Sequence, residues 1–473
     1  MFRSACRLRN TANRARSLSF LAPLPCRFLP HTVESLLLLT IEKQIYGGDG
    51  LAHFPADERG RGKTAFVPFT LAGEKVEVEV SEQKPGFVRA VANRILETSA
   101  HRVAPQCPYF MRCGGCHYQH VEYEHQLEIK KEILRESLRR IAKLELESAI
   151  QVHPSPPWNY RNRSRLQVRA APEFCAGYFK MRSHEVLAVE QCPISSPLIN
   201  RGIATVWELG RAGKVPEGVR EIEFFADAED TRLLVELSCA PEARRAAVRD
   251  CAEQLRAVMP AIAGVVAFRA PAKGGLEKLL ASGDSAVSYR SESAAYRVSA
   301  GGFFQTNRFL IDQLARTVTQ QRSGELAFDL YAGAGLFSTA LACDFRHIIS
   351  VESSQTSATD LSYNRPPNGK AVHATVEQFL GQIGRGGKTE SLQSGRQPDL
   401  VIVDPPRSGL GERAARGLAQ LGAQQLTYVS CDPATLARDL LPLLAAGYRV
   451  ERAHLLDLFP QTYHLESVLH LSR

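Results

Sequence analysis

Short apolar runs that end abruptly in polar residues mark the C-terminal third of the chain. Leu400–Val403 is one such run, and Asp404 follows it directly. Residues 426–429 lead in the same way to Ser430 and Cys431. Runs of this kind are typical of strands that are buried on both faces, as in a parallel sheet. Because ligands of open α/β sheets bind beyond the carboxyl ends of the strands, we expect a carboxylate and a thiol to meet there.

A glycine-rich turn upstream predicts a binding site for an adenosine cofactor. Tyr331, Gly333 and Gly335 follow a predicted strand, and glycines in such a turn let the backbone approach a ligand closely. The next predicted strand ends at Glu352, where an acid can bind ribose hydroxyls. The turn lacks the third glycine of a dinucleotide fingerprint. Together with Asp404 after a later strand, it favours S-adenosylmethionine (SAM) over NAD.

Residues 36–95 show a different pattern, with short alternating runs broken by turn sequences. From Lys75 to Val80 polar and apolar residues alternate, which is the period of a half-buried strand. Several such strands in one short segment predict a small β-barrel. Barrels of this kind bind single-stranded nucleic acid through aromatic and basic side chains. The aromatic residues here, Tyr46 among them, serve equally well as core residues.

Residues 121–146 predict an amphipathic helix. Its apolar positions recur at helical spacing among many charges: Leu127, Ile133, Leu134, Leu138 and Ile141. Further strands are predicted within residues 176–190, 219–239 and 263–299, with a helix near 242–258. This mixture indicates an α+β region.

Arginines occupy alternate positions before a predicted strand in this region, at Arg161, Arg163 and Arg165. Alternate positions share one side of a strand. Such a row could hold an RNA backbone or could pair with acids of a neighbouring strand, and the sequence leaves both interpretations open.

Four of the 11 cysteines form a pattern. Three are spaced C-x5-C-x2-C and the fourth stands before a distant proline: Cys107, Cys113, Cys116 and Cys192. This arrangement favours a 4Fe–4S cluster over zinc, because structural zinc sites usually have paired C-x-x-C motifs or include histidine. Zinc with His117 or His120, and unligated cysteines, are the alternatives. Cysteines this few and scattered do not form a disulfide scaffold in a chain of 473 residues.

The first 33 residues contain six arginines and no Asp or Glu. Their composition is that of a mitochondrial transit peptide, of a disordered basic leader or of sequence before the true start codon, and we exclude residues 1–34 from the fold prediction. The net charge of +8 suits a polyanionic partner such as RNA. No apolar run has the length needed to span a bilayer, so we expect no membrane association.

Five sequence blocks, in chain order, resemble those of the SAM-dependent RNA uracil-5 methyltransferase family. They are FFQTN, DLYAGAGLF, DPPRSGL, SCDPATLARDL and FPQTYHLE. The cysteine pattern and the N-terminal barrel, which resembles a TRAM domain, are similar to the iron–sulfur branch that methylates 23S ribosomal RNA. The resemblance covers roughly residues 38–473.

The resemblance implies a covalent mechanism. Cys431 would add to C6 of a uridine, C5 would accept a methyl group from SAM, and Glu466 would remove the C5 proton to leave 5-methyluridine. The uridine must leave its stack to reach the thiol. The resemblance places SAM contacts at Gln305, Tyr331, Glu352 and Asp404, and the glycine-rich turn adds Gly333 and Gly335. It places the ligands of a 4Fe–4S cluster at Cys107, Cys113, Cys116 and Cys192.

We therefore expect an α/β protein with a Rossmann-like SAM-dependent methyltransferase domain over residues 301–473. A central α+β domain with the cluster would span 97–300, and an OB-like TRAM barrel 35–96. We expect a cytoplasmic monomer that acts on 23S ribosomal RNA. The alternatives are the same reaction on tRNA, which the cysteines and the barrel disfavour, and a non-catalytic RNA-binding or ribosome-assembly factor. Cytosine-5 methyltransferases generally carry Pro before the nucleophile, whereas Ser430 stands here.

Overall fold

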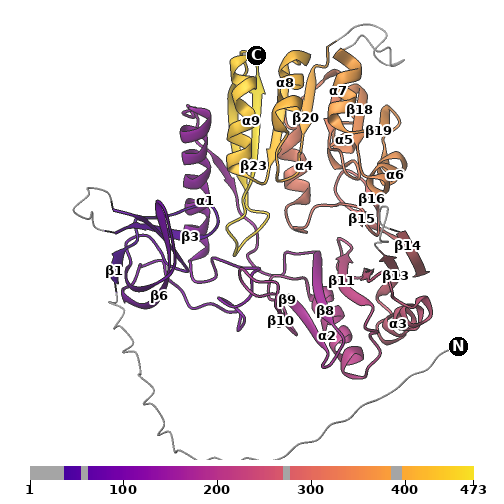
Figure 1. Ribbon diagram of the computed structural model, residues 1–473. Helices are drawn as coiled ribbons and strands as arrows, with labels where there is room; N and C mark the ends of the chain where they lie inside the picture. The colour runs from indigo at the N-terminus through magenta and orange to yellow at the C-terminus, as the bar shows by residue number, and fades with distance from the viewer. Residues whose placement is uncertain (1–36, 55–61, 270–276, 385–396) are drawn as a thin grey trace, which may run out of the picture.

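The computed structural model describes residues 37–54, 62–269, 277–384 and 397–473. The leader predicted over residues 1–34 lies outside this range. Figure 1 shows three regions: an N-terminal barrel, a central sheet with its helices, and a C-terminal sheet covered by helices on both faces. The predicted α/β fold with a β-rich N-terminal region is confirmed.

The N-terminal sheet has six strands in the order β1-β5-β6-β4-β3-β2. They are β1 (Leu37–Thr40), β2 (Lys43–Gln44), β3 (Asp49–His53), β4 (Thr64–Pro68), β5 (Lys75–Lys84) and β6 (Phe87–Glu97). The predicted alternation holds at the start of β5, where Val76 and Val78 are buried and Glu79 is exposed. One side chain in two points inward, and these side chains form the apolar core of the barrel.

The central sheet has seven strands in the order β10-β9-β8-β11-β12-β13-β14. They are β8 (Arg163–Arg169), β9 (Cys175–Phe179), β10 (Val186–Ala188), β11 (Val219–Ala226), β12 (Leu233–Cys239), β13 (Ile262–Arg269) and β14 (Glu277–Gly283). Helices α2 (Pro197–Arg211) and α3 (Arg245–Val258) share an apolar core with this sheet. The hairpin β15 (Ala286–Arg290) and β16 (Ala295–Ser299) leads to the C-terminal region.

The arginines of β8 pair with acids on the neighbouring strand β11. Arg163 Nη1 lies 3.1 Å from Glu223 Oε1, and Arg165 Nη2 lies 2.8 Å from Glu223 Oε2. Arg165 also reaches Glu221. For these two residues the structure favours the interpretation as a row of ion pairs over an RNA cradle.

The C-terminal sheet has eight strands in the order β19-β18-β17-β20-β21-β23-β22-β7. They are β17 (Gly324–Leu330), β18 (Phe345–Glu352), β19 (Gly369–His373), β20 (Leu400–Val403), β21 (Gln425–Ser430), β22 (Arg449–Leu456), β23 (Glu466–Ser472) and β7 (Gln151–His153). Strands β17 to β21 are parallel, and β23 runs antiparallel between β21 and β22. The predicted strand at Leu400–Val403 is confirmed and is buried throughout.

Both faces of this sheet are covered. The helices are α4 (Ile311–Thr319), α5 (Leu336–Ala340), α6 (Gln355–Asn364), α7 (Val376–Gly384), α8 (Gly411–Leu421) and α9 (Pro433–Ala445). Phe328 packs with α7, α8 and α9, whereas its neighbour Ala327 packs with α4 and α5 on the opposite face. Leu326, Ala327 and Phe328 of β17 are therefore apolar at consecutive positions.

An earlier segment completes the C-terminal sheet. The predicted helix of residues 121–146 is α1 (Tyr123–Ser137), continued by the π-helical turn η1 (Leu138–Ala142). Figure 1 shows α1 beside α9, and its Ile133 and Leu134 share a core with that helix. Ile141, predicted on this face, is 39% exposed because the wider π-helical turn rotates it outward. Strand β7 then pairs with β22 in parallel.

Within the described residues, no helix is both long enough and apolar enough to cross a membrane.

Candidate active site and cysteine cavity

The predicted thiol and carboxylates meet at one edge of the C-terminal sheet. Asp404 follows β20 and Cys431 follows β21, and these strands are parallel neighbours, so their carboxyl ends coincide. Glu466 begins β23, whose next residue, Ser467, is opposite Ser430 in antiparallel register. The structure therefore brings together Cys431, Asp404 and Glu466, which come from three separate sequence blocks.

Burial and mutual repulsion control protonation at this edge. Burial, followed by the charges of Glu466 and Asp404, raises the pKa of the Cys431 thiol to about 12. Burial and the neighbouring Asp329 raise the pKa of Asp404 to about 7. The pKa of Glu466 also lies well above its ordinary value, through burial and the charge of Asp404. Arg407 opposes the shifts at Cys431 and Glu466, so it is the cation that favours a thiolate here.

The nucleophile candidate stands at the start of a capped helix. Asp432 Oδ1 accepts hydrogen bonds from the backbone N–H groups of Ala434 and Thr435 at 3.1 and 2.9 Å. Pro433 occupies the first position of α9, where its missing N–H costs nothing. The positive end of the helix dipole therefore lies beside Cys431 and favours a negative sulfur.

A buried carboxylate fixes the two loops that carry Asp404 and Cys431. Asp439 in α9 accepts from Leu410 N at 2.6 Å and from Tyr428 OH at 2.9 Å. Arg438, which also binds Asp439, donates to Ser408 O at 2.8 Å. The two strand ends therefore keep a fixed relative position.

Three side chains near Cys431 were not assigned to this site from the sequence. Arg407 Nη2 donates to His464 Nε2 at 3.3 Å, and burial lowers the pKa of His464 to about 3, so its ring is a neutral acceptor. Tyr46 of the barrel donates from its hydroxyl to Cys431 O at 3.1 Å. The position of Arg407 four residues beyond the end of β20 is a signal that could have found it. No local signal pairs Tyr46 with a residue 385 positions away.

The six positions expected to bind a cofactor lie near the carboxyl ends of β17, β18 and β20. Gly333 N donates to Glu352 Oε2 at 2.9 Å, and Gln305 Nε2 donates to Asp404 Oδ2 at 3.4 Å. Tyr331, Gly333 and Gly335 have positive φ angles of 64°, 54° and 94°. The glycines adopt these angles without steric cost, and at Tyr331 the backbone is strained.

The four predicted ligand cysteines line a single cavity: Cys107, Cys113, Cys116 and Cys192. All four are free thiols. Burial and the nearby Cys192 raise the pKa of Cys113 to about 11, so the sulfurs lie within electrostatic reach of one another. In the described part of the chain, no three His, Cys, Asp or Glu side chains converge closely enough to hold a single metal ion.

His117 and His120, the possible ligands of the alternative zinc site, do not line this cavity. The ring of His117 packs against Tyr463 at a centroid distance of 4.6 Å. The ring of His120 is buried against Phe110 and Phe69. The cavity therefore offers four thiols and no histidine.

Two family models match the chain. One, described as tRNA (Uracil-5-)-methyltransferase, matches residues 122–473, and the other, the TRAM domain, matches residues 31–92. A 23S rRNA (uracil(1939)-C(5))-methyltransferase RlmD of Pseudomonas fluorescens is 31% identical, over 91% of this chain and 90% of the relative. An uncharacterized RNA methyltransferase of Streptomyces avermitilis is 33% identical, over 86% of this chain and 92% of the relative.

A solved structure shares the fold. It is the Pyrococcus abyssi tRNA (uracil-54, C5)-methyltransferase in complex with S-adenosyl-L-homocysteine. The superposition has a TM-score of 0.68 at 23% identity, and covers 92% of this chain and all of the other.

Proposed function

The chain belongs to the tRNA (uracil-5-)-methyltransferase family, and from that premise we propose that it transfers a methyl group from SAM to C5 of a uridine in 23S ribosomal RNA. The product would be 5-methyluridine. The observation that carries the proposal is the meeting of Cys431, Glu466 and Asp404 at one sheet edge. The reaction needs a thiol and a base from the protein, and here they come from two neighbouring strands.

The residues present fit SAM. Gly333 and Gly335 leave the turn without Cβ atoms, so that a ligand can approach the backbone. The carboxylate of Glu352 ends β18, where it can accept from ribose hydroxyls. Gln305, Tyr331 and Asp404 complete the proposed contacts. When bound, SAM supplies an electrophilic methyl carbon.

Cys431 would begin the reaction as a thiolate. Its sulfur forms a bond to C6, and the electron pair of the C5–C6 double bond moves toward the carbonyl oxygen at C4. C5 then has the electron density to accept the methyl group. Glu466, once ionised, removes the remaining proton from C5, the double bond re-forms and the Cys431 sulfur leaves. The raised pKa of Glu466 makes its carboxylate a stronger base for that step.

One relative favours ribosomal RNA over tRNA. The Pseudomonas fluorescens relative, whose name specifies 23S rRNA, is 31% identical to this chain along nearly its whole length. The Pyrococcus abyssi tRNA enzyme shares the fold at 23% identity, and a similarity at this level does not indicate a shared substrate. We further propose a monomer located in the cytoplasm. The predicted domain division is 35–96, 97–300 and 301–473, and we propose that residues 123–153 be counted with the C-terminal part, against which they pack.

We also propose that Cys107, Cys113, Cys116 and Cys192 hold a 4Fe–4S cluster. All four thiols are free and line one cavity, and histidine is absent from its lining. A cluster takes one thiolate on each of four iron atoms, so its ligand sulfurs are more widely spaced than those around one zinc ion. This fits thiols that share a cavity without converging on a point. The chemistry above needs no electron transfer, so the role we propose is structural.

The test is methyl transfer from labelled SAM to unmodified 23S rRNA fragments and to tRNA, by wild type and Cys431→Ala. We expect label in 23S rRNA that disappears with Cys431→Ala. Label in tRNA alone would show that tRNA, the alternative, is the substrate. Absence of label on both RNAs, with SAM still bound, would favour the non-catalytic RNA-binding factor.

A further inference from the structure

Residues 457–465 form an irregular loop that connects β22 to β23 and delivers two side chains to the active site. Glu466 follows its last residue, and His464, the acceptor of Arg407, lies on it. Irregular loops reach surface water for most of their hydrogen bonds. Here much of the loop is buried, and it is bound by residues far earlier in the chain.

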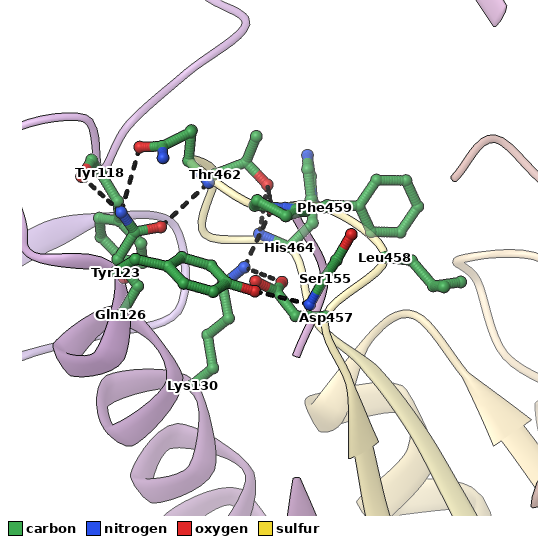
Figure 2. Close-up of polar contacts among 12 residues, drawn as sticks. Tyr118, Tyr123, Gln126, Lys130, Ser155, Asp457, Leu458, Phe459, Thr462 and His464 are labelled. Atoms are coloured by element: carbon green, nitrogen blue, oxygen red, sulfur yellow. Dashed lines mark hydrogen bonds and ion pairs between the residues drawn. The ribbon is translucent and has the colours of Figure 1, made fainter. Parts of the chain in front are cut away.

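A buried ion pair holds the first part of the loop. Lys130 Nζ of α1 donates to Asp457 Oδ1 at 2.6 Å and to Phe459 O at 3.0 Å. Figure 2 shows the lysine reaching from α1 into the loop. Both charged side chains are 0% exposed. Burial lowers the pKa of Lys130 and Asp457 opposes that shift, so the charge of the lysine depends on this partner.

An amide pair holds the middle of the loop. Gln126 of α1 donates to Gln461 Oε1 at 3.1 Å and accepts from Gln461 N at 3.0 Å. Gln461 O in turn accepts from His117 N and Tyr118 N at 2.8 and 2.9 Å. Gln461 has a φ of 67°, a left-handed conformation that a non-glycine residue keeps only when its surroundings hold it.

Apolar side chains would fill these two positions of α1 at a lower desolvation cost. Replacing a buried ion pair by well-packed apolar residues is often neutral or stabilising. Unlike apolar side chains, Lys130 and Gln126 make directional hydrogen bonds to particular atoms of the loop. These atoms belong to Asp457, Phe459 and Gln461.

We propose that Lys130 and Gln126 are positioning residues, which hold the 457–465 loop so that Glu466 faces Cys431 and His464 meets Arg407. Their effect on turnover rests on the proposed function, whereas their effect on the loop does not. When the loop is released, addition of Cys431 continues but removal of the C5 proton is slowed. The covalent adduct then accumulates, which a general loss of folding would not cause.

The decisive variant is Lys130→Met in the full chain, with Lys131→Met as its control. Lys131 is the next residue of α1, and its ammonium pairs with Glu128 at the surface. We expect Lys130→Met to lower kcat on the order of 100-fold, with KM for RNA and SAM within about twofold of wild type. The Cys431–RNA adduct with ordinary uridine substrate should accumulate on denaturing gels. Lys131→Met should behave as wild type.

A second variant and a measurement independent of activity complete the test. Gln126→Leu should also accumulate adduct, and hydrogen exchange at the amides of residues 457–465 should be faster in both variants than in the control. Unchanged exchange would overturn the inference. So would a loss of kcat that only follows the unfolded fraction, without adduct. If wild type neither methylates nor forms adduct, the proposed function fails, and the exchange data still decide whether Lys130 and Gln126 position the loop.

Discussion

The protein carries two cysteine sites whose thiols look alike until their neighbours are compared. Burial is the largest cause of a raised pKa at Cys113 in the cavity and at Cys431 at the sheet edge. The titratable neighbours of Cys113 are other thiols, whereas those of Cys431 are carboxyl groups and Arg407. A set of thiols is suited to bind a metal cluster, because metal atoms replace the proton of every thiol that binds them. A thiol beside carboxyls and a cation can lose and regain a proton within one turnover.

The largest effect that separates the two sites should come from Glu466→Gln. An amide cannot accept the C5 proton, so we expect kcat to fall on the order of 10² to 10⁴-fold while the Cys431–RNA adduct persists. Adduct and turnover are measured together in single-turnover reactions. Glu412→Gln is the control, because Glu412 is a surface acid paired with Arg416 on α8. Full turnover by Glu466→Gln would assign the base to another group.

Cys192→Ser should disrupt the site in the cysteine cavity and leave the reaction at Cys431 intact. We expect loss of iron and sulfide from the purified protein, and a fall of several kcal/mol in the free energy of unfolding, because a structural metal site contributes folding energy. Folded molecules that remain should still form adduct through Cys431. The exposed Cys343, as Cys343→Ser, is the control. Iron content equal to that of wild type would remove Cys192 from the ligand set.

The pH dependence of alkylation should sharpen the comparison at Cys431. Its thiol pKa of about 12 means that the thiolate fraction increases with pH, about tenfold per unit while the neighbouring charges stay constant. Asp404 ionises as pH passes about 7 and opposes that increase, so the slope should be shallowest around pH 7 and steeper again at higher pH. Peptide-resolved mass spectrometry after timed iodoacetamide treatment measures the rate. A plateau between pH 8 and 9 would contradict the raised pKa.

The smallest effect is expected from Tyr46→Phe, which removes one hydrogen bond between the barrel and Cys431 O. One neutral hydrogen bond is worth about 1 kcal/mol, so kcat should fall about fivefold or less. Tyr363→Phe, on an exposed side chain of α6, is the matched control. Steady-state methylation assays resolve a change of that size, and identical rates for the two variants would show that the barrel contact does not affect Cys431.

The sheet edge was predictable because Cys431, Asp404 and Glu466 each adjoin a short apolar run in a distinctive block. The residues that support this edge could not be predicted from the sequence. Lys130 and Gln126 belong to a helix rich in charge, and polarity along a helix does not show that a lysine is buried against an acid 327 residues away. Strand β7 has three residues, too few for any period to be visible. Ile141 followed the helical spacing but lies beyond the point where regular α-helix ends.

Strand β7 and helix α1 have a consequence for how this protein can be divided. They come before the central sheet in sequence, yet one extends the C-terminal sheet and the other covers α9. A fragment that starts at residue 301 would leave the β22 edge unpaired and the apolar side of α9 uncovered. The catalytic part is therefore not a module that can be cut out or exchanged at a single boundary. The central sheet is better regarded as an insertion into it, and transfer of the activity to another scaffold would require residues 123–153 as well.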